Sequence, residues 1–317
     1  MFYRISLLIT GLVLVLFFCL ALWSRLGIQA LQRDYPPTGD FIDVDGYRLH
    51  YQLRGNGPPI LLIHGANSNL RDFSSSLMPR LAQQYTVLAI DRPGYGYSSR
   101  PPDGDWLDPA AQARLLLLAA HQLGLERPLL VGHSWAGAVV MTALVRMPEQ
   151  VSGGVLLAGA SGHWSGSTGA IYTLAKVPFV RELFAHTLVY PAGRVFIDRA
   201  VAKVMAPNPV PENYRQRIAA DLALRPGTFL HNAADMNRLS EFLQGESRYY
   251  DRIEQPLLII HGEADELVPF WNHGQRLLSV VADTELMLLP DVGHAPHHVQ
   301  ADAIARRIAE FRARLGR

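Results

Sequence analysis

Short, nearly continuous apolar runs constrain this chain more than any other feature of its sequence. Each run is five to eight residues long and rich in Val, Ile and Leu. Runs of this length and composition are typical of strands that are buried on both faces of a parallel sheet. They occupy residues 59–64, 85–91, 128–132, 151–158, 256–261 and 284–289.

Helical patterns alternate with these runs, at residues 108–123, 136–147 and 299–315. A hairpin is predicted over residues 40–54, where Asp45-Gly46 is a two-residue turn signal. The repeated order of strand and helix predicts an α/β fold with a mostly parallel, doubly wound sheet. In such a fold, functional side chains gather at the carboxyl ends of the strands.

One long segment interrupts this alternation. Residues 161–246 show helical patches punctuated by proline and no clear strand. Because 86 residues are too many for a loop, we expect a helical subdomain, here called a cap. The cap divides the predicted core into residues 39–160 and residues 247–317.

The N-terminus is expected to lie outside the globular core. Residues 5–24 carry no charge, and a helix of twenty residues spans about 30 Å, the thickness of a bilayer's hydrocarbon core. We therefore predict a transmembrane anchor over residues 1–25, followed by a short tether over residues 26–38. The alternative is a cleaved signal peptide, although Cys19-Leu20-Ala21 is a poor cleavage site.

The charges flanking this span are nearly balanced, so its orientation is weakly encoded. Arg4 and the N-terminal amine stand on one side, and Arg25, Arg33 and Asp34 stand on the other. The positive-inside rule gives a slight preference for a globular domain outside the cytoplasm.

The overall charge excludes one class of partner. The chain has 29 Lys and Arg residues and 28 Asp and Glu residues, a net charge of +1. It therefore lacks the excess of basic residues that is typical of nucleic-acid-binding proteins. A small molecule or a lipid is the more plausible partner. The only cysteine is Cys19, which excludes a disulfide within the chain.

The strongest chemical signal is the segment LLVGHSWAG at residues 129–137. It places Ser134 between an apolar strand and a helix, and the small residues Gly132 and Ala136 allow the strand and helix to pack closely around a sharp turn. Here the chain resembles the α/β-hydrolase superfamily, whose nucleophile elbow reads G-x-S-x-G. This chain has alanine in place of the last glycine.

The resemblance implies a chain order of serine, acid and histidine. A serine needs a base to accept its proton and an acid to orient that base. Asp265 follows the run at 256–261 and lies in a G-x-x-D-x-x-V-P segment, and His294 follows the run at 284–289 in a Gly-His pair. We predict that Ser134, Asp265 and His294 form the catalytic triad.

Neighbouring residues offer rival assignments. Glu263 and Asp291 are alternative acids, and Asp291 is expected to form a turn. His297 and His298 closely follow His294 and are expected at the solvated start of a helix. His261 is expected to end a strand without a catalytic role.

The segment His64-Gly65-Ala66 resembles the family's oxyanion loop. By this resemblance the backbone N–H groups of Ala66 and Trp135 form the oxyanion hole, and glycine at 65 allows close approach of the backbone. The segment DRPGYGYS at residues 91–98 resembles another turn of the family and is interpreted as mainly structural.

No cofactor is expected from the sequence. It has neither a G-x-G-x-x-G nor a P-loop pattern, and its histidines do not show a metal-binding spacing such as H-E-x-x-H. The serine at the elbow argues against epoxide or carbon–halogen chemistry, which uses aspartate in this superfamily.

The resemblance, which covers residues 40–317, implies a serine hydrolase that cleaves a carboxylic ester. The predicted anchor lies outside the family pattern and would tether this hydrolase to a membrane. Alternatives of the same fold are a carbon–carbon bond hydrolase, a perhydrolase and a binding protein without turnover. The apolar start of the cap, at residues 171–190, is interpreted either as packing onto the core or as an acyl tunnel or membrane-facing surface. The oligomeric state is not encoded in any recognisable pattern.

Overall fold

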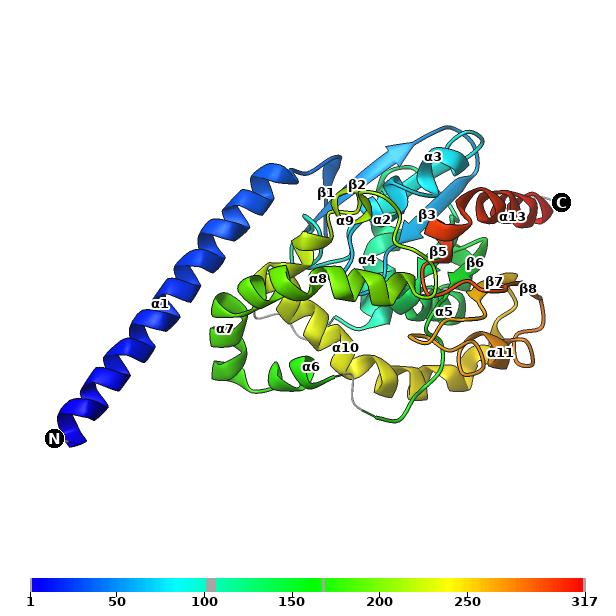
Figure 1. Ribbon diagram of the computed structural model, residues 1–317. Helices are drawn as coiled ribbons and strands as arrows, with labels where there is room; N and C mark the ends of the chain where they lie inside the picture. Colours follow the sequence, from blue (N-terminus) through cyan, green and yellow to red (C-terminus); the bar gives the residue numbers. More distant parts are fainter. Residues whose placement is uncertain (1, 101–106, 167–168, 316–317) are drawn as a thin grey trace.

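A single mixed sheet forms the centre of the molecule (Figure 1). The computed structural model describes residues 2–100, 107–166 and 169–315. Its strands have the order β1-β2-β4-β3-β5-β6-β7-β8. The pairs β1–β2 and β2–β4 are antiparallel, and β3 to β8 run parallel, as predicted. The strands are β1 (Asp40–Val44), β2 (Tyr47–Arg54), β3 (Pro59–Ile63), β4 (Thr86–Ile90), β5 (Leu129–His133), β6 (Gly153–Leu157), β7 (Leu257–Gly262) and β8 (Thr284–Leu289).

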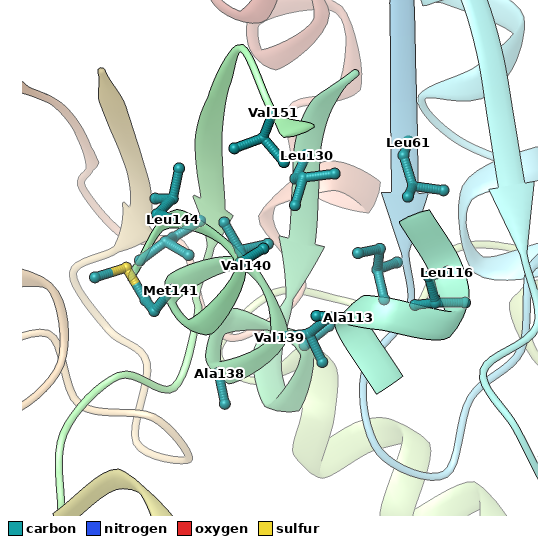
Figure 2. Close-up of a cluster of buried hydrophobic side chains, with 14 of the residues drawn as sticks. Leu61, Ala113, Leu116, Leu130, Ala138, Val139, Val140, Met141, Leu144 and Val151 are labelled. Atoms are coloured by element: carbon teal, nitrogen blue, oxygen red, sulfur yellow. The ribbon is translucent and has the colours of Figure 1, made fainter. Parts of the chain in front are cut away.

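Helices cover both faces of the sheet, which explains why its strands are apolar on both sides. Successive residues of a strand point to opposite faces. Leu61 packs with α4 (Pro109–Gln122) and α5 (Gly137–Arg146) on one face, and Ile60 packs with α3 (Met78–Leu81) and α13 (Ala301–Arg314) on the other. Figure 2 shows the first of these clusters, with the side chains of α5 between β5, β6 and α4.

The segment between β6 and β7, residues 161–246, is called the insertion. In its described part the regular elements are helical, in agreement with the prediction. The longest helix of the insertion is α10, which contacts α6, α7, α8 and the core helix α5. The helical elements are α6 (Ala170–Leu174), α7 (Pro178–Thr187), α8 (Val189–Met205), α9 (Tyr214–Arg217), η3 (Ala220–Leu224) and α10 (Pro226–Glu246).

Short helices complete the core and lie mostly at the ends of strands. They are α2 (Arg71–Ser74), η1 (Ser134–Ala136), η2 (Pro148–Gln150), η4 (Ser247–Arg252), α11 (Gly274–Leu277) and α12 (Pro296–Val299). Two of them bear on the site below, because α2 and α12 bring polar side chains toward the ends of β5 and β8.

The segment predicted as a tether, residues 26–38, is helical over most of its length. Helix α1 runs without a break over Phe2–Asp34, so residues 26–34 are helical. Gln, Ala, Leu and Arg in this stretch are strong helix formers, and Pro36-Pro37 stop the helix. Tertiary contacts with α7 and α8 also support it. Helix α1 is long and apolar enough to cross a membrane.

Candidate active site

Ser134 lies at the sharp turn from β5 into η1 and α5. Its φ of +52° is in the left-handed region, which residues other than glycine rarely adopt. The turn depends on small neighbours, because a Cβ at Gly132 would lie 2.7 Å from the Ala136 carbonyl oxygen. This strained geometry presents the Ser134 hydroxyl beyond the carboxyl end of β5.

The structure brings Ser134, His294 and Asp265 together from three separate strand ends. The Ser134 Oγ lies 2.9 Å from Nε2 of His294, and Nδ1 of the same ring lies 2.8 Å from the Asp265 Oδ2. In the tautomer that carries its proton on Nδ1, the imidazole donates to Asp265 and accepts from the serine hydroxyl. This is the arrangement that a serine nucleophile and its base require.

Asp265 is buried and stays ionised because several donors surround it. Its Oδ1 accepts hydrogen bonds from the backbone N–H groups of Leu267 (2.8 Å) and Val268 (2.9 Å). Burial alone would raise the pKa of this carboxyl, but His294, His261 and these donors outweigh burial and hold the pKa well below its usual range. Asp265 is therefore a fixed negative charge behind His294.

The His294 ring is also buried. Burial lowers the pKa of His294 below its ordinary value, and the Asp265 carboxylate opposes this shift without cancelling it. The nearby His133 lowers the pKa further. At neutral pH, His294 is therefore in the neutral form that can accept a proton.

The rival acids and His261 occupy other positions. Glu263 is exposed, and Asp291 adopts a φ of +57° in the turn after β8, as expected of a turn former. His261 lies near the end of β7, as predicted, and next to Asp265. Its Nε2 donates to the Val268 carbonyl at 2.7 Å and lies 3.5 Å from the Asp265 Oδ2.

The expectation for His297 and His298 is wrong, because both side chains are buried. The Nε2 atoms of His297 and His298 lie 3.1 Å and 2.7 Å from the Asp72 Oδ1, within hydrogen-bond distance. Asp72 belongs to α2 and had no motif to reveal it. Its Oδ2 faces Nδ1 of His133 at 3.4 Å, and Nε2 of His133 donates to the His294 carbonyl at 2.9 Å.

The cluster of Asp72 with His133, His297 and His298 holds together the loops that carry Ser134 and His294. Asp72 connects the residue before Ser134 with the helix that follows His294. Donor atoms of Asp72, His297 and His298 lie within 4.8 Å of one another, a grouping that could hold a metal ion and that sequence spacing did not indicate. The hydrogen bonds to Asp72 account for the burial of both imidazoles without a metal.

The predicted oxyanion loop lies against the elbow, and a Cβ added at Gly65 would lie 3.0 Å from the Cβ of Ser134. The Gly65 carbonyl lies 2.8 Å from Nδ1 of His64 and accepts a hydrogen bond from Nη2 of Arg92 at 3.1 Å. Since the C=O and N–H of a trans peptide point in opposite directions, these donors also fix the direction of the Ala66 N–H.

Arg92 connects this loop with Trp135. Its guanidinium is fully buried and lies 4.1 Å from the ring centroid of Trp135. It also pairs with Asp235 of α10 at 3.1 Å, and the indole N–H of Trp135 donates to the Asp235 carbonyl at 3.3 Å. The segment at residues 91–98 therefore does more than form a turn, because its arginine supports both residues predicted to supply the oxyanion hole.

The family model for the alpha/beta hydrolase fold matches residues 58–301, which include all of these positions. The chain belongs to the alpha/beta hydrolase family. An uncharacterized protein of Mycobacterium tuberculosis is 29% identical to this hydrolase, with 83% of this chain and 77% of the relative covered. The 2-hydroxymuconate semialdehyde hydrolase of a Pseudomonas species is 24% identical, with 88% and 95% covered. The solved structure of a membrane phospholipase A is 21% identical, with 99% and 98% covered and a TM-score of 0.63.

A cavity of about 620 Å³ opens beside Ser134 in this hydrolase. The core, the insertion and the loop after β7 all contribute to it. Its walls are mainly apolar, although His163, Asn272 and His273 also line it. The large apolar side chains are Trp135, Trp164, Met236, Leu239, Leu267 and Trp271.

Proposed function

We propose that this protein is a membrane-tethered serine hydrolase that cleaves carboxylic esters with an apolar acyl group. The observation that carries the proposal is the hydrogen-bonded series from Ser134 through His294 to Asp265, opening onto an apolar cavity. The insertion acts as a cap that forms part of the cavity wall, and α1 acts as the anchor.

The reaction follows from these positions. His294 accepts the hydroxyl proton as the Ser134 Oγ attacks the ester carbonyl, and the N–H groups of Ala66 and Trp135 stabilise the oxyanion. The intermediate collapses when His294 protonates the leaving alcohol, which leaves an acyl-enzyme on Ser134. Water, deprotonated by His294, then attacks the acyl carbonyl and releases the carboxylic acid with the serine restored.

A carbon–carbon bond hydrolase is the second candidate, supported by the likeness to 2-hydroxymuconate semialdehyde hydrolase over nearly its whole length. The lining of the cavity favours the ester. Apart from His163, Ser165, Asn272 and His273 it is mostly apolar, and Trp164 and Trp271 suit an acyl chain better than a substrate that carries a charged carboxylate.

The test uses the full-length protein in detergent with a series of p-nitrophenyl esters from acetate to palmitate and one ring-cleavage product. We expect ester turnover that rises with acyl length until the cavity is filled, together with labelling by a fluorophosphonate. Ser134→Ala is the control and should lower kcat by several orders of magnitude without loss of fold. Near-normal turnover by this variant would contradict the assignment.

Other outcomes separate the alternatives. Turnover of the ring-cleavage product alone would establish the second candidate, and absence of both labelling and turnover would establish a binding protein. The anchor is tested separately. Retention in membranes after an alkaline carbonate wash is expected, whereas a soluble native form that begins near Leu22 would show a cleaved signal peptide.

A further inference from the structure

Helix α1 is covered by other parts of the chain along only part of its length. Residues 2–16 are exposed on every side, whereas one face of the helix is partly or fully buried from Phe17 onward. The covered residues recur every three or four positions, the spacing of a single helix face. They include Phe17, Leu20, Ala21, Ser24, Gly27, Ile28 and Leu31.

This covered face begins inside the apolar run at residues 5–24. The elements that contact α1 include α7 and α8. Tyr190 at the start of α8 lies against Gly27, since a Cβ there would be 2.1 Å from its ring. Helix α7 precedes α8 in the chain. It lies beside α1 at a point closer to the N-terminus of α1 than α8 does (Figure 1). At 1.5 Å per residue, Phe17 is about 10 Å deeper in the apolar run than Ser24.

The outer side of α7 carries large apolar side chains that the described part of the chain leaves largely or half exposed. Phe179 is 93% exposed, and Leu183 is 51% exposed. Lys176 and Arg181 are exposed close by, and Arg181 also pairs with Glu182 at 3.3 Å. Exposed apolar residues beside basic ones are typical of a helix that lies about 5–10 Å deep at a membrane surface, with its cations near lipid phosphates.

We propose that α7 is immersed in the leaflet that α1 enters, with Phe179 and Leu183 among the acyl chains of a phospholipid bilayer. This inference rests on the proposed anchor, because α1 fixes the depth of α7. Helix α7 contacts α10, which contributes Met236 and Leu239 to the cavity. The cavity wall is therefore one helix away from the lipid, and a lipid-soluble ester is the substrate class this position favours.

The test measures depth directly and does not depend on catalysis. In a Cys19→Ser background, Phe179→Cys is labelled with an environment-sensitive fluorophore, and the full-length protein is reconstituted into vesicles of phosphatidylcholine and phosphatidylglycerol. Leu53→Cys is the matched control, because Leu53 is an apolar side chain, 40% exposed, on a core strand. We expect lipids with a doxyl group near the headgroup to quench the probe at 179 and not the probe at 53.

Equal quenching of both probes by aqueous iodide, with no effect of doxyl lipid on either, would overturn the proposal. A blue-shifted probe at 179 that doxyl lipid does not quench would also overturn it, and would indicate that a second copy of the chain covers α7. Failure of α1 to insert is recognised separately, because the protein would then leave the vesicles in a carbonate wash.

A paired substitution gives a functional readout. Phe179→Ser with Leu183→Ser should lower turnover of a long-chain ester embedded in vesicles by about tenfold or more, because two large side chains no longer partition into lipid. Turnover of a water-soluble short-chain ester should stay unchanged. Equal losses on both substrates would contradict a role at the membrane, and Leu53→Ser is the control.

Discussion

The proposed base and the proposed oxyanion hole lie on two sides of the Ser134 hydroxyl, and buried groups of opposite charge hold them in place. On the base side, the carboxylates Asp265 and Asp72 hold a set of histidines. On the oxyanion side, the guanidinium of Arg92 holds the loop at Gly65 and stacks on Trp135. Imidazoles titrate near neutral pH and guanidinium groups do not. His64 also lies on the oxyanion side, but burial and the Arg92 charge lower its pKa to about 4. Between pH 5 and pH 8, the pH dependence of the proposed reaction should therefore come from the base side.

Removal of the proposed base should have the largest effect. His294→Ala leaves the Ser134 hydroxyl without an acceptor for its proton, so kcat should fall by several orders of magnitude. Labelling of Ser134 by a fluorophosphonate should be lost in parallel. Full labelling at the normal rate would show that another group activates the serine.

Loss of Arg92 should test the oxyanion side and have the next largest effect. Arg92→Met keeps an apolar side chain against Trp135 but removes the donor to Gly65, and kcat should fall by about a hundredfold or more, as when an oxyanion donor is removed. KM for a short ester should change little, because the oxyanion forms only in the transition state. Affinity for a trifluoromethyl ketone should fall with kcat/KM.

The matched control for this variant is Arg100→Met. The Arg100 guanidinium also pairs with Asp235, at 2.9 Å, whereas the hydrogen bonds to the Gly65 carbonyl come from Arg92 and His64. A similar loss of kcat in both variants would mean that Arg92 only stabilises the fold around Asp235. Thermal unfolding of both proteins should accompany the kinetics.

The pH profile of kcat/KM should distinguish the base side from the oxyanion side, with a smaller effect than the two substitutions above. Because His294 must be neutral and its pKa is lowered, kcat/KM should rise with pH through a midpoint below about 6.5 and then stay level. His133→Gln should move the midpoint upward, since His133 lowers the pKa of His294. Arg92→Met should leave the midpoint in place. A midpoint clearly above 6.5, with chemistry rate-limiting, would argue against His294 as the base.

The second carboxylate–histidine cluster should affect stability more than rate. Burial lowers the pKa of His297 to about 3, so the imidazole stays neutral in the folded protein while the unfolded chain takes up a proton below about 6.5. The free energy of unfolding should thus fall as pH decreases from 6.5, by up to about 1.4 kcal/mol per pH unit for this histidine.

Urea unfolding of His297→Gln at several pH values checks this expectation, because the variant should show a shallower fall. His121→Gln is the control, since the His121 side chain is 68% exposed. Identical slopes for wild type and His297→Gln would show that His297 is not held neutral.

The positions of Ser134, Asp265 and His294 and of the loop at Gly65 could be predicted from the sequence, and the buried groups that hold them could not. Ser134, Asp265 and His294 each follow an apolar strand, and the carboxyl ends of parallel strands meet at one edge of a sheet. Asp72 lies in a four-residue helix without a motif, and its partners are more than sixty residues away in the chain. Asp235 of α10 reaches Arg92 only because the insertion packs over the core.

The bounds of the strands could also be predicted to within about two residues. A strand that is buried on both faces is apolar at nearly every position, and this pattern is plain in the sequence. The end of the N-terminal helix was not found. Apolar character stops at Ser24, but helical structure depends on intrinsic propensity and on packing, and both continue to Asp34. Burial of Leu31 depends on the insertion, more than a hundred residues later in the sequence.

Because α1 is one continuous helix, it fixes the orientation of the apolar run relative to the rest of the protein. A flexible tether would tolerate an added residue anywhere along it. In a continuous helix, one residue inserted between Arg25 and Gly27 rotates everything before it by about 100° and advances it by about 1.5 Å relative to the covered face. The number of residues in this stretch therefore sets the azimuth of the apolar run, and four inserted residues, close to a whole turn, should be tolerated better than two.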